Sequence, residues 1–373
     1  MGDAGASLQG SRPVKAARAP RRPVPARRPA PRARSAPTGL ATRLAGRLAT
    51  RLAICAALAG VAAPAAAQLR AFEFVLDNDQ FAFTPPGEER WYTSGGFIRA
   101  AFDAPAGSAD ARLAAAWCRV VFGCDRDARI YRVLSLNQTI HTPGLPASTT
   151  APQPYDRPYA AALTLGADSV VIGPSTRQTL SLRLGAIGPA ALGEPVQNGI
   201  HRVLGQSPTL GWGWQVRAQP VVQLGWSRLS AFGGAGSGPD VVLRTAVLAG
   251  NPVTEAALGA MLRFGRRPSG PTWPGETLGA REPDGWYGFA GLEGRAIARD
   301  ALIDGRPYGY ASRIEREPFA GSAFVGVSFG AFADWRLDFS LALHSVPFAS
   351  PIEPATMKPQ RIGTIGLRWQ PAR

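Results

Sequence analysis

Hydrophobic and polar residues alternate in short segments along most of the chain after residue 68. In residues 71–79, Phe72, Phe74 and Leu76 share one face of an extended segment, and the residues between them share the other. Twelve such segments are expected to form strands: 71–79, 92–102, 129–140, 159–171, 179–186, 211–229, 240–249, 254–264, 286–298, 320–330, 334–345 and 360–369.

A helical period appears after the fifth of these segments. Val196, Ile200 and Val203 recur at helical spacing, and Gly205 stands where a helix C-terminus is typically capped. The pattern predicts a short helix, bounded by Gly and Pro residues, between two strands. His201 follows Ile200 and is placed at the margin of the apolar stripe.

One apolar face and one mixed polar face in each strand are typical of an outer-membrane barrel. A soluble core would not bury the charges on the faces opposite the apolar ones, which are those of Glu73, Asp77, Arg99, Arg183 and Arg217. No run of eighteen apolar residues follows residue 68, so we expect no transmembrane helix. We predict an all-β fold, an antiparallel transmembrane β-barrel of about twelve strands with a short helix in an extracellular loop. A soluble β-sandwich or lipocalin-like barrel is the alternative.

Aromatic residues near the strand ends match the girdles of such barrels. In the second segment we place Tyr92 on the outer face with Ile98 and Phe102, and Thr93 on the inner face with Arg99. The other aromatics near strand ends are Trp91, Trp212, Trp214, Trp226, Trp286, Tyr287, Trp335 and Trp369.

The net charge of +15 is concentrated at the N-terminus, where residues 1–51 hold twelve Lys or Arg and one acidic residue, Asp3. Such a block is expected to be disordered, and it also resembles a nucleic-acid-binding arm. An apolar run at 52–63 and Ala65-Ala66-Ala67 follow it, which together indicate a secretory signal. We therefore expect residues 1–67 to form a basic leader plus signal peptide and residues 68–373 to form the mature barrel domain. We also expect export to the outer membrane of a Gram-negative cell, and no nucleic-acid partner.

Cys118 and Cys124 lie six residues apart in an expected loop. An even pair of cysteines in an exported chain predicts a disulfide, here in an exterior loop. Residues 141–156 and 265–285 are also expected to be loops on the exterior side.

Polar residues with useful chemistry lie near strand ends. Asn78 and Asp79 end the first strand, Thr93 begins the second, and Arg157 precedes the fourth. With His201 they could meet at one rim, where Asn, Asp and Thr oxygens suit Ca²⁺ and His201 is the plausible base near neutral pH. Taken singly, Asn-Asp also reads as a turn and Asp-Arg as an ion pair inside a barrel.

These motifs resemble those of the outer-membrane lipid A 3′-O-deacylases (LpxR-type). The resemblance rests on the Asn-Asp pair, Tyr-Thr-x-Gly, Asp-Arg-Pro-Tyr-Ala and Gly-Glu-x-Val-Gln followed by His, and it covers residues 69–369. It implies a twelve-stranded barrel that uses Ca²⁺ to hydrolyse the 3′ ester of lipid A. It also implies active-site roles for Asn78, Asp79 and Thr93, with calcium near the first two, and His201 as general base.

One position departs from the family pattern. An acidic residue five positions after the histidine is replaced here by Gln206, which offers a carbonyl oxygen as a metal ligand but no charge. Glu194 could compensate, by its position, for the negative charge that Gln206 lacks. Arg157 and Arg202 are candidate contacts for the phosphates of lipopolysaccharide, and we expect a monomer surrounded by outer-membrane lipids.

The resemblance therefore predicts a carboxylic ester hydrolase. The alternatives are a non-enzymatic barrel, either a porin or a lipid A binder, and an outer-membrane phospholipase. The sequence leaves open the acyl-chain preference, the true start codon and any latency of activity in the membrane.

Overall fold

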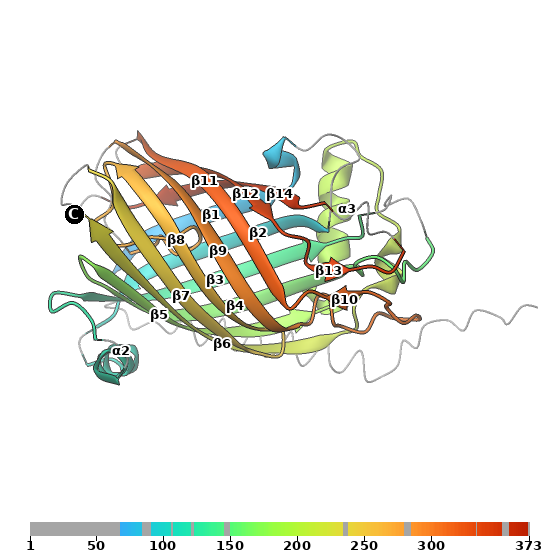
Figure 1. The fold of residues 1–373 in the computed structure, drawn as a ribbon, viewed down its shortest axis with the longest axis horizontal. Coiled ribbons are helices and arrows are strands. Elements are labelled where there is room, and N and C mark those ends of the chain that lie inside the picture. Colours follow the sequence, from blue (N-terminus) through green and yellow to red (C-terminus); the bar gives the residue numbers. More distant parts are fainter. Residues whose placement is uncertain are drawn as a thin grey trace, which may run out of the picture. The chain divides into compact units, whose positions relative to one another are not determined.

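The protein is described here from a computed structural model that defines residues 68–83, 91–105, 107–120, 123–144, 150–233, 238–279, 285–332, 334–352 and 358–371 (Figure 1). The predicted leader and signal peptide, including Cys55, lie outside the described residues.

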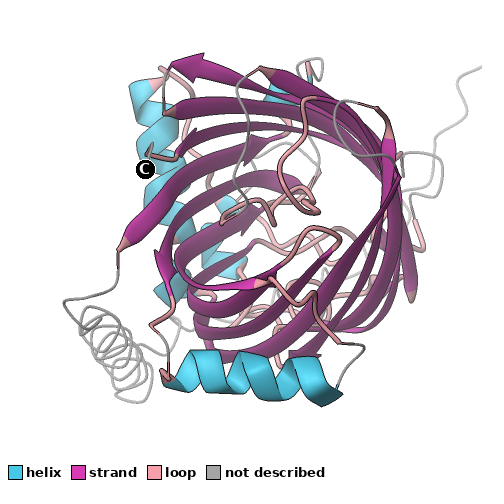
Figure 2. Ribbon diagram, turned by 90° about the vertical axis from the view of Figure 1, so that its left-hand side faces the viewer, coloured by secondary structure: helices cyan, strands magenta, loops and turns pink. Residues whose placement is uncertain are grey.

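Twelve strands of the described residues close into one antiparallel barrel, which confirms the predicted all-β fold (Figure 2). Each predicted segment overlaps one of them. The strands are β1 Leu69–Asn78, β2 Tyr92–Asp103, β3 Arg129–His141, β4 Ala160–Ile172, β5 Thr176–Ile187, β6 Gln219–Gly233, β7 Asp240–Gly250, β8 Val253–Gly265, β9 Trp286–Asp300, β11 Phe319–Phe332, β12 Trp335–His344 and β14 Gln360–Trp369. A separate pair joins β10 Glu315–Arg316 to β13 Phe348–Ala349.

Within the described residues, two α-helices and three 3₁₀ helices lie in the connections. They are α2 Ala109–Val120, α3 Gly193–Val203, η1 Gln80–Ala82, η2 Pro189–Ala191 and η3 Gly211–Trp214. Helix α2 lies at the end of the barrel where β1 begins and β14 ends, here called the terminal end, and α3 lies at the opposite end (Figure 1). No helix in the described part of the chain is long and apolar enough to span a membrane.

The barrel closes where its first strand meets its last. β1 pairs with β14 from Phe72 opposite Trp369 to Asn78 opposite Gly363. On β1, Phe72, Phe74 and Leu76 are 37%, 39% and 39% exposed, whereas Glu73 is 2% exposed. The alternation read from the sequence therefore separates an apolar outer face from a polar interior.

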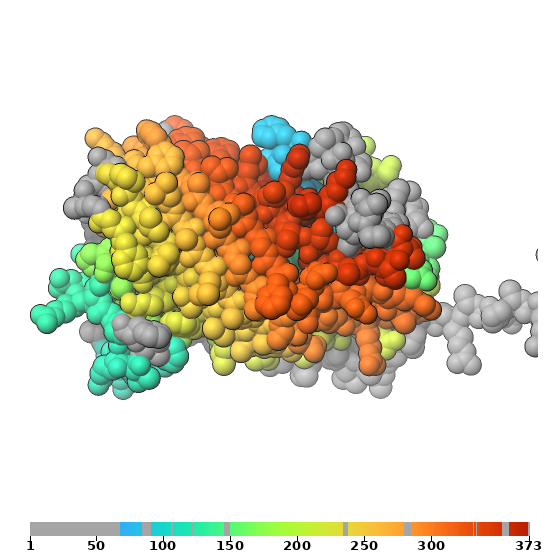
Figure 3. All heavy atoms as spheres, viewed as in Figure 1, coloured from blue at the N-terminus to red at the C-terminus, as the bar shows by residue number. Residues whose placement is uncertain are grey.

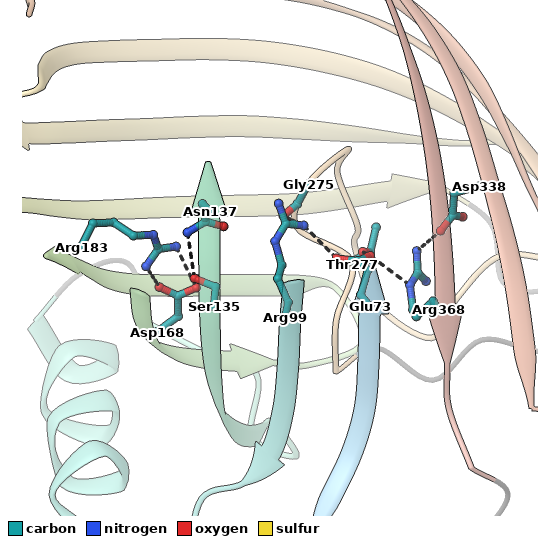
Figure 4. Close-up of polar contacts among 10 residues, drawn as sticks. All are labelled: Glu73, Arg99, Ser135, Asn137, Asp168, Arg183, Gly275, Thr277, Asp338 and Arg368. Atoms are coloured by element: carbon teal, nitrogen blue, oxygen red, sulfur yellow. Dashed lines mark hydrogen bonds and ion pairs between the residues drawn. The ribbon is translucent and has the colours of Figure 1, made fainter. Parts of the chain in front are cut away.

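Charged side chains in the interior are paired with one another (Figure 4). Arg99 donates to Glu73 at 2.8 Å, and Arg368 donates to Glu73 at 3.2 Å and to Asp338 at 2.6 Å. Glu73 thus joins β1, β2 and β14 at the closing seam. Because an unpaired charge is costly away from water, this pairing explains how the barrel tolerates charges that a soluble core would exclude.

A segment of the β8–β9 connection also runs through the interior. Thr277 donates to Glu73 at 2.6 Å, Arg99 donates to the Gly275 carbonyl at 3.0 Å, and Arg244 pairs with Glu276 at 3.0 Å. Residues 270–279 are therefore anchored to the inner wall, and we call them the inner segment. They contribute to the walls of two interior cavities, of 320 Å³ and 520 Å³.

The positions of the loops correct the expectation that all of them lie on the exterior side. The connection 142–159 joins β3 to β4 at the α3 end, whereas 266–285 joins β8 to β9 at the terminal end. The structure contains the predicted Cys118–Cys124 disulfide, but at the terminal end. Cys118 lies in the last turn of α2 and not in the loop expected for both cysteines. The helix with His201 and the disulfide therefore cannot both be extracellular.

A bulge reverses the predicted orientation of Tyr92. Tyr92 pairs with His141 and Ser94 pairs with Ile140, so Thr93 is an extra residue in β2. The extra residue breaks the alternation, and Tyr92 points inward, where its hydroxyl donates to Asp77 at 3.3 Å. Its placement beside Ile98 on the outer face was wrong.

The start of the sixth predicted strand was also wrong. Residues 211–214 form η3, in which Trp212 is buried, and β6 begins at Gln219. Arg217 lies before β6, is exposed, and has its guanidinium 5.9 Å from the Tyr308 ring centre. It is not an inward-facing strand residue, because the chain has not yet entered the barrel.

We expect Glu73→Ala to lower the free energy of unfolding by about 3–5 kcal/mol, because Arg368, fully buried, would lose a partner. Guanidinium unfolding of the barrel in detergent micelles would measure this. Asp103→Ala is the matched control: it removes an ion pair with Arg70 at the rim and should cost at most about 1 kcal/mol. Equal losses in both variants would contradict a central role for Glu73.

Candidate functional site

Helix α3 packs on the outside of the barrel wall. Val133 and Asn137 line an interior cavity, so Gln138 and Ile140 on the same strand face outward. Ile140 is nevertheless fully buried, because it belongs to a cluster with residues from the α3 connection. That cluster comprises Ile140, Tyr159, Ala161, Ala191 and Trp212, with Leu163 and Val196 against it.

The predicted helix is present, but a different face of it is buried. Helix α3 ends at Val203, and Gly205 adopts a left-handed φ of 69°, as expected for a glycine after a helix C-terminus. The buried residues of α3 are Gly193 and Gln197, and Gln197 accepts a hydrogen bond from the Trp212 indole at 2.9 Å. Ile200 and Val203, expected on a buried stripe, are 48% and 86% exposed.

The side chain of His201 is held by another residue of the connection between β5 and β6. Its Nδ1 lies 2.8 Å from the Ser207 carbonyl oxygen. A carbonyl only accepts, so Nδ1 carries the proton and the neutral ring keeps an unprotonated Nε2. The Asn198 side-chain amide donates a hydrogen bond to the Thr209 carbonyl and accepts one from the Thr209 N–H. These two hydrogen bonds fix the turn that brings Ser207 back to His201. The ring is thus set in the tautomer that a general base requires.

Asn78 and Asp79 lie at the same end of the barrel as α3. Asn78 continues the outward-facing set of β1, and its Oδ1 accepts the backbone N–H of Gln80 at 2.7 Å. Asp79 is 4% exposed and begins η1. Thr364 and Arg368 line an interior cavity, so Gly363 faces outward, and Phe81 of η1 lies against it. Like α3, η1 therefore covers the outer wall.

Thr93 is the bulged residue between these two elements. Its hydroxyl shares a hydrogen bond with Thr142 at 2.8 Å, and the next residue, Ser94, pairs with both Asn78 and Ile140. The strand ends that carry Asn78 and Thr93 thus lie next to the part of β3 that α3 covers. The structure therefore brings Asn78, Asp79 and Thr93 to the end of the barrel that carries His201, where η1 and α3 cover the outer wall.

The remaining predicted residues divide between two locations. Gln206, Arg202 and Glu194 are exposed around α3, and the Gln206 N–H donates to the His201 carbonyl at 2.8 Å. Arg157 lies in the interior, 5% exposed, and lines the 520 Å³ cavity. Burial lowers the pKa of its guanidinium, and the charges of Asp300 and Asp156 partly offset this. Its placement gives no support to a phosphate contact on the outer face.

An interior cluster under the rim was missed by sequence reasoning. Tyr92, His141 and Arg157 line the same cavity, and the Tyr92 and His141 rings meet edge to face at 5.1 Å. The signal that could have revealed the cluster is the bulge, because only an extra residue in β2 turns Tyr92 inward.

The oxygen donors of the site suit a hard cation. Asn78, Asp79, Thr93 and Gln206 offer amide, carboxylate and hydroxyl oxygens, as Ca²⁺ prefers. Within the described ranges, no three His, Cys, Asp or Glu side chains gather as a metal-binding group. Any site here therefore depends on amide, hydroxyl or backbone oxygens beside Asp79.

Comparison with known proteins agrees with this architecture. Residues 51–370 match the family profile described as "Outer membrane protein LpxR". LpxR from Salmonella typhimurium has a similar structure, with a TM-score of 0.64 and 17% identity, covering 80% of this chain and 99% of that one. A more remote match is the KdgM porin in complex with disordered oligogalacturonate, with a TM-score of 0.33 and 6% identity, covering 81% of this chain and 99% of that one.

 The β domain of the Bordetella autotransporter BrkA matches with a TM-score of 0.37 and 11% identity, over 81% of this chain and 98% of that one. A comparison with curated protein sequences found no match.

A closed barrel with an apolar outer face, paired charges inside and a polar site at one rim defines an outer-membrane β-barrel protein. The chain belongs to the LpxR outer membrane protein family. Outer-membrane barrels have short periplasmic turns and longer extracellular loops. Five of the six connections at the α3 end have at least thirteen residues, and the longest is 188–218, whereas three of the five at the terminal end have six or fewer, namely 173–175, 234–239 and 333–334. This distribution favours an extracellular α3 end.

We expect Gly193→Val to detach α3 from the wall. A Cβ at Gly193 would lie 2.5 Å from the Trp212 ring and 2.6 Å from Ala161, so the helix must move outward. Limited proteolysis should cleave the 188–218 connection faster, while the heat-modifiable gel shift of the barrel stays unchanged.

Gly199→Ala is the matched control on the same helix. A Cβ there meets open space, and Ala is the better helix former by about 1 kcal/mol, so cleavage should be no faster than in the parent protein. Equal protease resistance of the Gly193→Val variant and the parent would contradict the tight packing of α3.

Proposed function

We propose that the protein is a lipid A 3′-O-deacylase, a carboxylic ester hydrolase that removes the 3′-linked acyl chain from lipid A of lipopolysaccharide. Membership of the LpxR family supports this activity. The observation that carries the proposal is the position of His201 on a helix packed against the outer wall, where a lipid in the membrane can reach it.

His201 acts as the general base. While Nδ1–H donates a hydrogen bond to the Ser207 carbonyl, Nε2 takes a proton from a water molecule. The resulting hydroxide adds to the ester carbonyl, the bond to the sugar oxygen breaks, and that oxygen receives the proton back from Nε2. The products are a free fatty acid and a 3′-hydroxyl, so one water molecule is consumed for each ester cleaved.

Calcium is the proposed cofactor. Asn78 and Asp79 would hold the ion with the Thr93 hydroxyl nearby, and a bound Ca²⁺ supplies Lewis-acid polarisation of the ester carbonyl. Gln206 follows the helix of His201 and can add a neutral amide oxygen. Because it lacks the charge of a carboxylate, its contribution to calcium affinity is smaller.

Exposed apolar residues beside His201 support a substrate with acyl chains. Ile200, Val203 and Leu204 are 48%, 86% and 61% exposed, and Phe83 after η1 is 86% exposed. Arg202 is exposed on the same helix, and we propose that it contacts a phosphate of the substrate. An apolar surface next to a cation fits an anionic lipid better than a soluble ester.

The inner segment weighs against a porin. Residues 270–279 cross the interior and bind Glu73, Arg99 and Arg244. A phospholipase would use the same chemistry on a glycerolipid, and a lipid A binder would bind without hydrolysis, so lipid analysis separates both from the proposal. We also propose that export uses the basic leader and signal segment before Gln68, and that the barrel acts as a monomer.

We expect His201→Ala to reduce release of 3′-acyl chains by about 10²–10⁴-fold, the usual contribution of a general base. Mass spectrometry of lipid A from cells expressing the parent or the variant would measure it. The heat-modifiable gel shift should be unchanged, because the side chain lies on a helix outside the barrel. A folded variant that deacylates at the parent rate would refute the role of His201.

Chelation of calcium should abolish deacylation by the parent protein, and Asp79→Ala should reproduce the effect in the presence of calcium. Gln206→Glu should tighten calcium binding, measured by titration calorimetry, because a carboxylate replaces an amide. Unchanged activity after exhaustive chelation would exclude a calcium requirement.

In planar bilayers the parent protein should show no steady ion conductance. Glu276→Ala combined with Thr277→Ala removes the side-chain anchors of the inner segment to Arg244 and Glu73, so intermittent conductance should appear. Stable channels in the parent protein would favour the porin alternative.

A further inference from the structure

Helix α2 also lies on the outer wall, at the terminal end. Asp168 and Val170 line an interior cavity, so Ser169 and Val171 of β4 face outward. They are only 9% and 6% exposed, and α2 contacts both β3 and β4. The helix therefore covers wall surface that would otherwise contact lipid.

Several contacts fix this helix to the wall. The Gly123 carbonyl after α2 accepts hydrogen bonds from Gln178 at 2.7 Å and Arg228 at 3.1 Å. The Cys118–Cys124 disulfide closes the same turn, and Asp125 accepts the backbone N–H groups of Ser175 and Thr176. The rim of the barrel thus determines the position of α2.

The exposed surface of α2 has an apolar part and a basic part. Ala114 is buried and marks the side that faces the wall. From it, 100° per residue places Leu113 and Val120 about 100–120° to one side, and Arg112 and Arg119 about 140–160° to the other, on the face turned away from the wall. Leu113 and Val120 are 54% and 79% exposed, and both arginines are exposed. An apolar flank next to a basic outer face is typical of a helix at a membrane interface.

The direction of α2 agrees with this character. Figure 1 shows the helix end-on beside the barrel, and Figure 2, turned by 90°, shows it running across the view below the wall. Its axis therefore crosses the barrel axis and follows the plane of the membrane. In the space-filling view α2 projects from the wall at the terminal end (Figure 3).

We propose that α2 is an interfacial helix in the periplasmic leaflet of the outer membrane. Leu113 and Val120 enter the acyl region, and Arg112 and Arg119 bind the anionic headgroups of glycerophospholipids. Exposed Arg126 and Arg129 extend the basic surface. The inference rests on the outer-membrane location of the barrel and is independent of the deacylase activity.

Site-directed spin labelling of the mature protein in bilayers would test the placement. Spin labels at Leu113→Cys and Val120→Cys should be more accessible to oxygen than to a water-soluble nickel chelate. Labels at Arg112→Cys and Arg119→Cys should show the reverse. Leu258→Cys, on the exposed outer face of β8, and Asp127→Cys, exposed after α2, calibrate the lipid and water extremes.

Nickel accessibility at all four α2 positions equal to that at residue 127 would overturn the proposal. Low accessibility of all four to both reagents would also overturn it, since that result indicates a protein partner or a second copy covering the helix.

Headgroup binding is tested separately in nanodiscs. Native mass spectrometry should show preferential retention of phosphatidylglycerol over phosphatidylcholine by the parent protein. Arg112→Gln with Arg119→Gln should reduce this preference by about fivefold per arginine removed. Arg306→Gln, an exposed arginine at the α3 end, is the matched control and should leave it unchanged. An unchanged preference in the double variant would refute the anionic-headgroup contact.

Discussion

The rest of the molecule depends on the hydrogen bonds and ion pairs made by the carboxylate of Glu73. It accepts hydrogen bonds from Arg99 of β2, Arg368 of β14 and Thr277 of the inner segment, and so ties the closing seam to the interior. Closure carries η1 onto the outer face of β14 and sets β1 between β14 and β2, whose other neighbour is β3. Asn78 therefore ends β1 at the end of the barrel that carries α3.

Much of the fold could be predicted from sequence because alternation records which residues meet the membrane. Phe72, Phe74 and Leu76 identified the outer face of β1, and inward charges such as Glu73 identified a polar interior. Alternation fails where one residue is inserted, as at Thr93, because every side chain beyond the bulge changes side. It also cannot distinguish a strand from the buried 3₁₀ helix that contains Trp212.

The candidate site could be predicted only in part. Residue types and family motifs identified Asn78, Asp79, Thr93 and His201, and the structure places all of them at one end of the barrel. It could not be inferred that α3 packs through Gly193 and Gln197, because neither is a typical buried apolar residue. The apolar stripe was instead left exposed, since helical periodicity does not say whether an apolar face meets protein or lipid.

A site on the outer wall changes how a substrate reaches it. A lipid can arrive by lateral diffusion within its leaflet and need not be withdrawn from the bilayer. Withdrawal would expose the acyl chain to water at about 0.8 kcal/mol per CH₂, or roughly 10 kcal/mol for a chain of a dozen carbons. Because α3 is attached to the outside of the barrel, the encounter becomes two-dimensional, and the protein has no need to extract its substrate.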